Sequence, residues 1–164
     1  MQRFPKGWYA AETIAEHTRL DGKFPIGRPK TSEPGAPDWP PDENAWLLYR
    51  ATLYRVADGV RENDPACVEL AIRYIKLRYI GSYSGFIRSL LSRRLKHATL
   101  VVLQTQRLHD HFLILVLRGE RTEEFRQYLT LWRHILTKEQ RLEALQKVTL
   151  TLGESAGDWL AQRL

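Results

Sequence analysis

The sequence has little cysteine and no long apolar segment. Cys67, the only cysteine among 164 residues, has no partner for an intramolecular disulfide bond, so folding does not require an oxidising compartment. A single cysteine also excludes zinc clusters held by several thiolates, and the pattern ACVELAI around Cys67 is typical of a buried structural thiol. The N-terminus lacks the apolar core of a secretory signal, and no apolar run approaches the roughly 18 residues of a membrane span. We therefore expect a cytoplasmic protein that does not enter a membrane.

Motifs that name a reaction are missing as well. The sequence has no phosphate-binding glycine loop and no HExxH, and its GSYSG stretch carries Tyr83 where a nucleophile elbow carries serine. His109 and His111, with His97 as a third ligand, suggest a metal site only if they lie in a strand or turn, because residues two apart on a helix point about 200° apart. We predict no catalytic residue, no metal ion and no cofactor. An enzyme whose groups converge from distant positions is the alternative.

Proline is concentrated near the N-terminus. Seven of the eight prolines lie between Pro5 and Pro41, and proline removes a backbone donor and restricts the residue before it. Residues 1–42 are therefore predicted to form an extended arm with a possible short helix from about Trp8 to Leu20. Trp8, Phe24 and Trp39 are its expected anchors, either on the protein's own body or on a partner or twin subunit. Residues 43–164 form the predicted helical domain.

Helix signals follow one another in the first half of this domain. Asp42 is expected to cap a helix that runs to about Arg61. Asp64 followed by Pro65 is a strong start signal for a helix to about Tyr79, which carries apolar residues on two sides. Ser82 or Ser84 is expected to cap the next helix, to about Ala98. The predicted inner face of that helix consists of Phe86, Ile87, Leu90, Leu91, Leu95 and Ala98.

The second half of the domain continues the pattern. Thr99 opens an element to Leu117 that we interpret as a helix, because the alternative, a lone β-hairpin, is marginal by itself. Thr122 is expected to cap a helix from Glu123 to Leu136, and residues 137–140 form a capping box for a helix to about Leu152. Gly153 and Gly157 are expected to loosen the tail. The predicted fold is all-α, either an irregular bundle or a short stack of helical hairpins.

Part of the chain resembles a known group of proteins. The stretches NDPACVELAIRYI, FIRSLLSRRLKHA and GERTEEFRQYLTLWRHI, from about Asn63 to Ile135, resemble small HEAT-like bacterial proteins without assigned function. The resemblance rests on helix-packing positions and implies a stack of helical hairpins. It implies no catalytic residue.

Acidic residues are absent from the window between Leu70 and His109. The net charge is +6, and this window holds eight basic residues, whereas the other 17 basic residues are outnumbered by the 19 acids. A concentrated cationic surface attracts acidic proteins and polyanions. The residues predicted to bind a partner are Arg73, Lys76, Arg78, Arg88, Arg93, Lys96 and Arg107.

The eighth basic residue of the window is predicted to be structural. Arg94 falls in the middle of the apolar stripe of its helix, and a buried guanidinium needs a partner. Glu69, an acid just after Thr122, or backbone carbonyls are the expected partners.

These features favour a non-catalytic interaction module that binds an acidic protein, of the inhibitor, immunity or adaptor kind. Nucleic-acid binding through the basic residues is the alternative, although no helix-turn-helix, zinc finger or aromatic RNA-binding motif is present. An unrecognised enzyme is the third hypothesis, and a merely solvated basic face is compatible with the same residues. The N-terminal arm would also allow a homo-oligomer.

Overall fold

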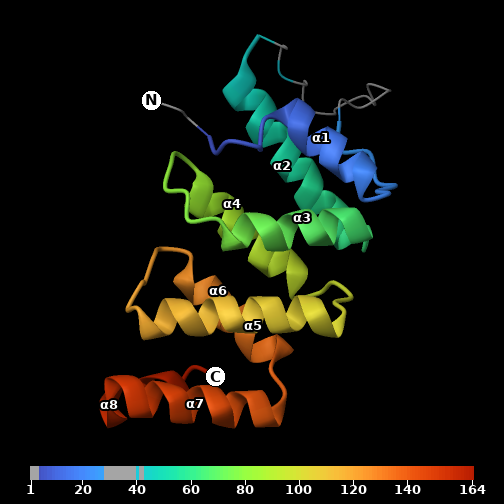
Figure 1. Cartoon of the computed structure of the whole chain (residues 1–164). Helices are drawn as coiled ribbons and strands as arrows, with labels where there is room; N and C mark the ends of the chain where they lie inside the picture. Colours follow the sequence, from blue (N-terminus) through green and yellow to red (C-terminus); the bar gives the residue numbers. More distant parts are fainter. Residues whose placement is uncertain (1–3, 28–39, 41–42) are drawn as a thin grey trace. The chain divides into compact units, whose positions relative to one another are not determined.

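The computed structural model describes residues 4–27, 40 and 43–164, whose regular structure is entirely helical (Figure 1). Eight helices and no β-strand occur in this part of the chain, so the predicted all-α fold is confirmed. The chain divides into two compact units, Met1–Thr99 and Leu100–Leu164. This division falls within the predicted helical domain and not at residue 42. We call them the first and second unit and describe each by itself.

The first unit is built around α2 (Ala45–Arg61), which contacts α1 (Ala10–Arg19), α3 (Pro65–Lys76) and α4 (Ser84–Leu95). The short helix predicted in the N-terminal arm is therefore present as α1. The prediction that α3 is apolar on two sides is also confirmed, because it packs against α1, α2 and α4. The fully buried side chains at the centre of this unit include Tyr49, Leu53, Leu70, Ile72, Tyr74, Ile75, Ile87 and Leu91.

The ends of α2 and α3 follow local hydrogen bonding. Asn44 caps α2, since its side chain accepts a hydrogen bond from the Leu47 N–H, whereas the predicted cap Asp42 lies outside the described residues. Asp64 caps α3 as predicted and accepts from the Cys67 N–H at 2.8 Å, with Pro65 as the first helical residue. The helix ends at Lys76, earlier than the predicted Tyr79.

The start of α4 differs from the prediction. Its N-cap is Tyr83, which has the left-handed backbone conformation (φ +66°), and not Ser82 or Ser84. Ser84 is instead the first residue of the helix. Its hydroxyl donates to the Gly81 carbonyl at 2.8 Å and accepts from the Gly81 N–H at 3.1 Å. The serine thus closes the turn that precedes the helix, and Tyr83 is held in a strained position beside it.

The buried face of α4 is also rotated from the predicted one. Phe86 is 52% exposed, whereas Ser92 and Arg88, which was predicted to bind a partner, are buried. Arg88 is buried because its Nη1 donates to the Tyr79 carbonyl at 2.8 Å, in the segment that follows α3. The prediction that Arg88 belongs to an exposed basic face is therefore wrong.

The second unit contains α5 (Val102–Leu117), α6 (Phe125–Ile135), α7 (Lys138–Leu152) and α8 (Glu154–Ala161). Residues 102–117 are a helix, as favoured over the hairpin, and α5 packs against α6 and α7. Leu108, Phe112 and Val116 are buried at helical spacing, and Phe112 stacks on Tyr128 with ring centroids 5.0 Å apart. The predicted cap Thr99 is not used, because Val101 is the N-cap of α5.

Two further helix starts and the tail complete this unit. The capping box of Thr137 and Gln140 is confirmed, while α6 begins at Phe125, later than predicted. The prediction of a loosened tail is wrong, because Gly157 lies within α8 and α8 packs along α7 (Figure 1). A Cβ atom at Gly157 would overlap the Oγ1 of Thr149, so glycine is what lets the two helices approach.

Among the described residues, none of the helices combines the length and the apolar character that a membrane crossing requires.

Candidate functional site

One group of side chains in the first unit combines a cation with exposed aromatic rings. Trp46, Arg50 and Tyr54 are four residues apart on α2 and therefore share one side of that helix. Tyr83 and Phe86, from the start of α4, pack against them. We call these five residues the arginine–aromatic cluster.

The guanidinium of Arg50 lies at the centre of the cluster. Its carbon is 4.2 Å from the ring centroid of Tyr83, 4.8 Å from that of Trp46 and 5.9 Å from that of Tyr54. The rings also contact one another, with centroids 5.5 Å apart for Trp46 and Tyr83. Each cation–π contact of this kind contributes about 0.5–1 kcal/mol at partly exposed sites. The three rings therefore hold the guanidinium in place without neutralising its charge.

Two hydrogen-bond donors in the cluster have no acceptor among the described residues. They are the buried Nε atom of Arg50 and the buried Nε1 atom of Trp46. In the described part of the chain no carboxylate pairs with Arg50. A buried donor without a partner costs about 1–3 kcal/mol. Two such donors beside a cation that no described carboxylate pairs with are therefore unusual in a purely structural feature.

The cluster reaches the protein surface through α4. Tyr83 is 49% exposed, and the nearby Ile80 is 85% exposed. Tyr83 also adopts a left-handed backbone conformation that costs a residue other than glycine about 1 kcal/mol. Backbone strain at an exposed ring is typical of positions that are kept for binding rather than for stability.

Exposed cations continue the surface. Arg93 follows Phe86 by seven residues, so the two side chains lie on the same side of α4 about two turns apart. Lys76, at the end of α3, and Arg78, in the connection to α4, are exposed, and Lys96 is partly exposed. Four of the seven predicted partner-binding residues are therefore accessible in the first unit.

The other three predicted residues are engaged or lie elsewhere. Arg73 is held by two acids, because its Nη1 donates to Glu16 at 2.7 Å and its Nε to Glu69 at 2.8 Å. Arg88 is buried, as described above. Arg107 is a partly buried residue of α5 in the second unit. Within the first unit, the burial of Arg88 and the pairing of Arg73 with two acids interrupt the predicted basic face.

Arg94 is half-buried, and among the described residues its buried Nε atom has no hydrogen-bond partner. Glu69, one of the acids expected to receive it, accepts a hydrogen bond from Nε of Arg73 at 2.8 Å. The role of Arg94 as a structural buried charge stays a prediction.

Two of the three predicted arm anchors pack within the first unit. Trp8 is buried and meets Tyr74 edge to face, with ring centroids 5.0 Å apart. Phe24 is partly buried beneath the guanidinium of Arg55, whose carbon lies 4.7 Å from the ring centroid. The third anchor, Trp39, lies outside the described residues. Phe4, which the sequence did not single out, stacks on Tyr49 at 5.1 Å.

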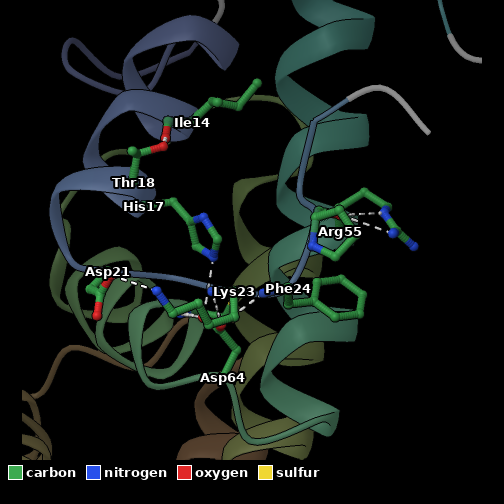
Figure 2. A network of polar contacts seen from close by, with 10 residues as sticks. Ile14, His17, Thr18, Asp21, Lys23, Phe24, Arg55 and Asp64 are labelled. Atoms are coloured by element: carbon green, nitrogen blue, oxygen red, sulfur yellow. Dashed lines mark hydrogen bonds and ion pairs between the residues drawn. The ribbon is translucent and has the colours of Figure 1, made fainter. Parts of the chain in front are cut away.

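A second group of polar side chains surrounds Asp64 (Figure 2). One carboxylate oxygen, Oδ1, lies 3.2 Å from Nε2 of His17 and accepts the Cys67 N–H. The other, Oδ2, accepts the backbone N–H groups of Lys23 at 2.6 Å and Phe24 at 2.9 Å. Asp64 thus joins α1, the turn after it and the start of α3.

The electrostatics of this group follow from burial and hydrogen bonding. Burial by itself would raise the pKa of Asp64, but the N–H donors of Phe24, Cys67 and Lys23 outweigh it and hold the pKa at about 2. Burial, with a smaller effect from the Asp64 carboxylate, raises the pKa of Cys67. Cys67 is fully buried, as expected for a structural thiol, and is therefore not an activated nucleophile.

The sequence predicted only one of these contacts. The Asp64–Cys67 cap follows from local spacing, whereas His17 lies 47 residues before Asp64 and no helix periodicity connects them. The one available signal was the polar His17 in an otherwise amphipathic helix.

The alternative metal site at His109 and His111 is excluded by their secondary structure. Both residues belong to α5, and a strand or turn was required to bring them together. His109 is buried, and its Nδ1 accepts a hydrogen bond from Nε1 of Trp132 at 2.9 Å. Burial lowers the pKa of His109. This histidine is a packed partner of Trp132 in the core of the second unit.

Comparison with protein-family models, with curated proteins and with solved structures finds no match for this chain. The resemblance to HEAT-like proteins therefore stays a prediction, and any statement about function has to be argued from the residues themselves.

Proposed function

We propose that the protein is a non-catalytic interaction module that binds an acidic region of another protein through the arginine–aromatic cluster. The observation that carries this proposal is the guanidinium of Arg50, which is caged by three rings and has no carboxylate partner among the described residues. A carboxylate from a partner would supply the missing negative charge. Its hydrogen bonds to a charged donor would contribute about 1.5–3 kcal/mol each.

The composition of the cluster supports a protein partner. Tryptophan, tyrosine and arginine are the residues that most often dominate the binding energy of protein interfaces. The exposed rings of Tyr83 and Phe86 offer apolar anchors beside the cation, and Ile80 extends the apolar area. The exposed charges of Arg93, Lys76 and Arg78 would steer an acidic surface toward the anchors.

Nucleic acid is the alternative partner, because aromatic rings and arginine also stack on unpaired bases. The engagement of Arg73 and Arg88 within the first unit weakens it, since fewer cations are left to contact phosphates.

Site-specific photo-crosslinking tests the proposal. A photoreactive phenylalanine analogue at Phe86 is expected to capture one protein in a cell lysate, before and after nuclease treatment. The matched control carries the same analogue at Leu150, which is 80% exposed in the second unit. Equal capture from both positions, or loss of the captured band after nuclease treatment, would contradict the proposal.

Substitutions in the arginine–aromatic cluster test whether its side chains are required for the crosslink. Tyr83→Gly and Arg50→Met are each expected to lower the crosslinking yield about tenfold or more, as for a residue that dominates an interface. Tyr83→Gly should change the free energy of unfolding by less than about 1 kcal/mol, because relief of the strained backbone offsets the lost ring contacts. The control Arg133→Met, at an exposed position of α6, should leave the yield unchanged. Circular dichroism and thermal unfolding establish that each variant is folded.

A further inference from the structure

Three side chains that can bind metals converge in the first unit. His17, Asp64 and Cys67 are all buried, and their potential ligand atoms lie within 4.8 Å of one another. His17 comes from α1 and Asp64 from the start of α3 (Figure 2). Cys67 lies in the first turn of α3. These three side chains are buried and fixed by the fold. They therefore form a defined set of metal donors, unlike exposed side chains that lie close together on a surface.

The backbone packs closely against two of the three ligand atoms. A Cβ atom at Gly22 would overlap Nε2 of His17, and a Cβ atom at Gly59 would overlap Sγ of Cys67. Neither glycine has a φ angle in the left-handed region, so the backbone conformation alone does not require glycine at either position. The close approach to the ligand atoms is what requires it.

The carboxylate is already oriented by the backbone. Oδ2 of Asp64 is held by the N–H groups of Lys23 and Phe24. Oδ1 accepts the Cys67 N–H and lies 3.2 Å from Nε2 of His17. Outer hydrogen bonds of this kind fix ligand orientation in metal sites.

We propose that Nε2 of His17, Oδ1 of Asp64 and Sγ of Cys67 form a binding site for one divalent cation of the zinc class. A set of one nitrogen, one oxygen and one sulfur suits a cation of intermediate softness such as Zn²⁺ and does not suit Mg²⁺ or Ca²⁺. Bonds of about 2.0–2.3 Å in a tetrahedral arrangement place ligand atoms about 3.5 Å apart. The ligand atoms lie within 4.8 Å of one another, so each pair has to approach by no more than about 1.3 Å. Three protein ligands leave one coordination position for a water molecule.

Binding of the cation releases one proton from the protein. The thiol proton of Cys67 leaves to solvent, and the sulfur binds as thiolate. His17 binds through its unprotonated Nε2, so its ring proton resides on Nδ1, and Asp64 exchanges its contact with the imidazole for a bond to the cation. The inference does not depend on the proposed protein partner, because the residues of the two sites are different.

Cobalt(II) is the probe for the full-length protein, because a thiolate bound to cobalt gives a charge-transfer absorption band in the near ultraviolet. Cys67 is the only cysteine of the chain, so such a band can come from this site alone. We expect the band to saturate at one equivalent of cobalt, to disappear on addition of zinc, and to be accompanied by a higher melting temperature with zinc. Absence of the band, or an unchanged melting temperature, would overturn the proposal and leave Asp64 as a purely hydrogen-bonded junction.

Variants separate this site from adventitious binding. Cys67→Ser keeps the size of the side chain and should abolish the band and weaken zinc binding at least about tenfold. His17→Ala should do the same, and Cys67→Ser stays informative if His17→Ala fails to fold. His97→Ala, at an exposed histidine of the same unit, is the matched control and should bind cobalt as the unmodified protein does. Zinc affinity that is unchanged in Cys67→Ser would contradict the assignment.

Discussion

At the scale of single residues, Asp64 shows how far sequence reasoning extends. The Asp-Pro pair predicts an N-cap, and the cap is present because it depends only on neighbouring residues. The contacts of the same carboxylate with His17, Lys23 and Phe24 could not be predicted, since they cross 40 to 47 residues of chain. The same limit applies to Arg50. Its spacing from Trp46 and Tyr54 was readable, but the contribution of Tyr83 from another helix was not.

The lowered pKa of Asp64 predicts a stability change in acid. Its pKa is about 2 in the folded state and about 4 in an unfolded chain, so its contribution is fully present above about pH 4 and is lost as the pH falls toward 2. A shift of this size corresponds to about 2 kcal/mol. Denaturant unfolding between pH 6 and pH 2 is expected to show this loss, and Asp64→Asn should reduce it.

Glu16 provides the control for this measurement. Its hydrogen bonds with Arg19 and Arg73 also lower its pKa to about 2, so it contributes to the same pH window. Glu16→Gln removes that share and should leave the part that belongs to Asp64. An equally steep loss of stability in Asp64→Asn would show that this carboxylate does not control the acid response.

At the scale of elements, the positions of the helices were easier to predict than which face of each helix is buried. The capping box at Thr137 located α7, and α5 was favoured as a helix because a lone hairpin would be marginal by itself. For α4 the apolar residues alone suggested an inner face that includes Phe86, whereas the buried face includes Arg88. The decisive acceptor is the carbonyl of Tyr79, and sequence periodicity does not show which carbonyls are left unpaired after a helix ends.

Arg88 is therefore expected to stabilise the junction of α3 and α4. Arg88→Met retains an apolar stem of similar length but leaves the Tyr79 carbonyl without this donor, and we expect a loss of about 2–3 kcal/mol in the free energy of unfolding. Arg93→Met, five residues later on the exposed side of α4, should change it by no more than about 0.5 kcal/mol. Urea unfolding of both variants tests the difference. Equal effects would mean that the burial of Arg88 does not stabilise the fold.

At the scale of the whole molecule, the sequence predicted the all-α fold class but not the boundary between the two units. The helical pattern predicted an all-α protein, and the described residues are helical throughout their regular structure. The boundary between Thr99 and Leu100 has no proline-rich or glycine-rich linker to mark it, whereas the conspicuous prolines lie within the first unit. The net charge of +6 was equally visible, but the internal engagement of Arg73 and Arg88 was not.

The number of accessible cations predicts weak, shallow salt dependence toward nucleic acid. Four of the predicted partner-binding residues are exposed or partly exposed in the first unit, and each phosphate contact contributes about −0.9 to the slope of log affinity against log salt concentration. Binding through these four residues alone should therefore give a slope of about −4 in fluorescence anisotropy with a labelled DNA duplex. A markedly steeper slope, with tight binding at physiological salt, would favour nucleic acid over an acidic protein as the partner.

Because Cys67 is completely buried, the reactivity of its thiol reports local opening of the first unit. A thiol reagent can react only with molecules in which this unit has opened, because the sulfur is inaccessible in the closed state. When closing is fast, the labelling rate equals the rate of an exposed thiol multiplied by the fraction of open molecules. The time course of modification thus measures the local opening free energy of one unit in an otherwise native chain, without denaturant and without an introduced probe.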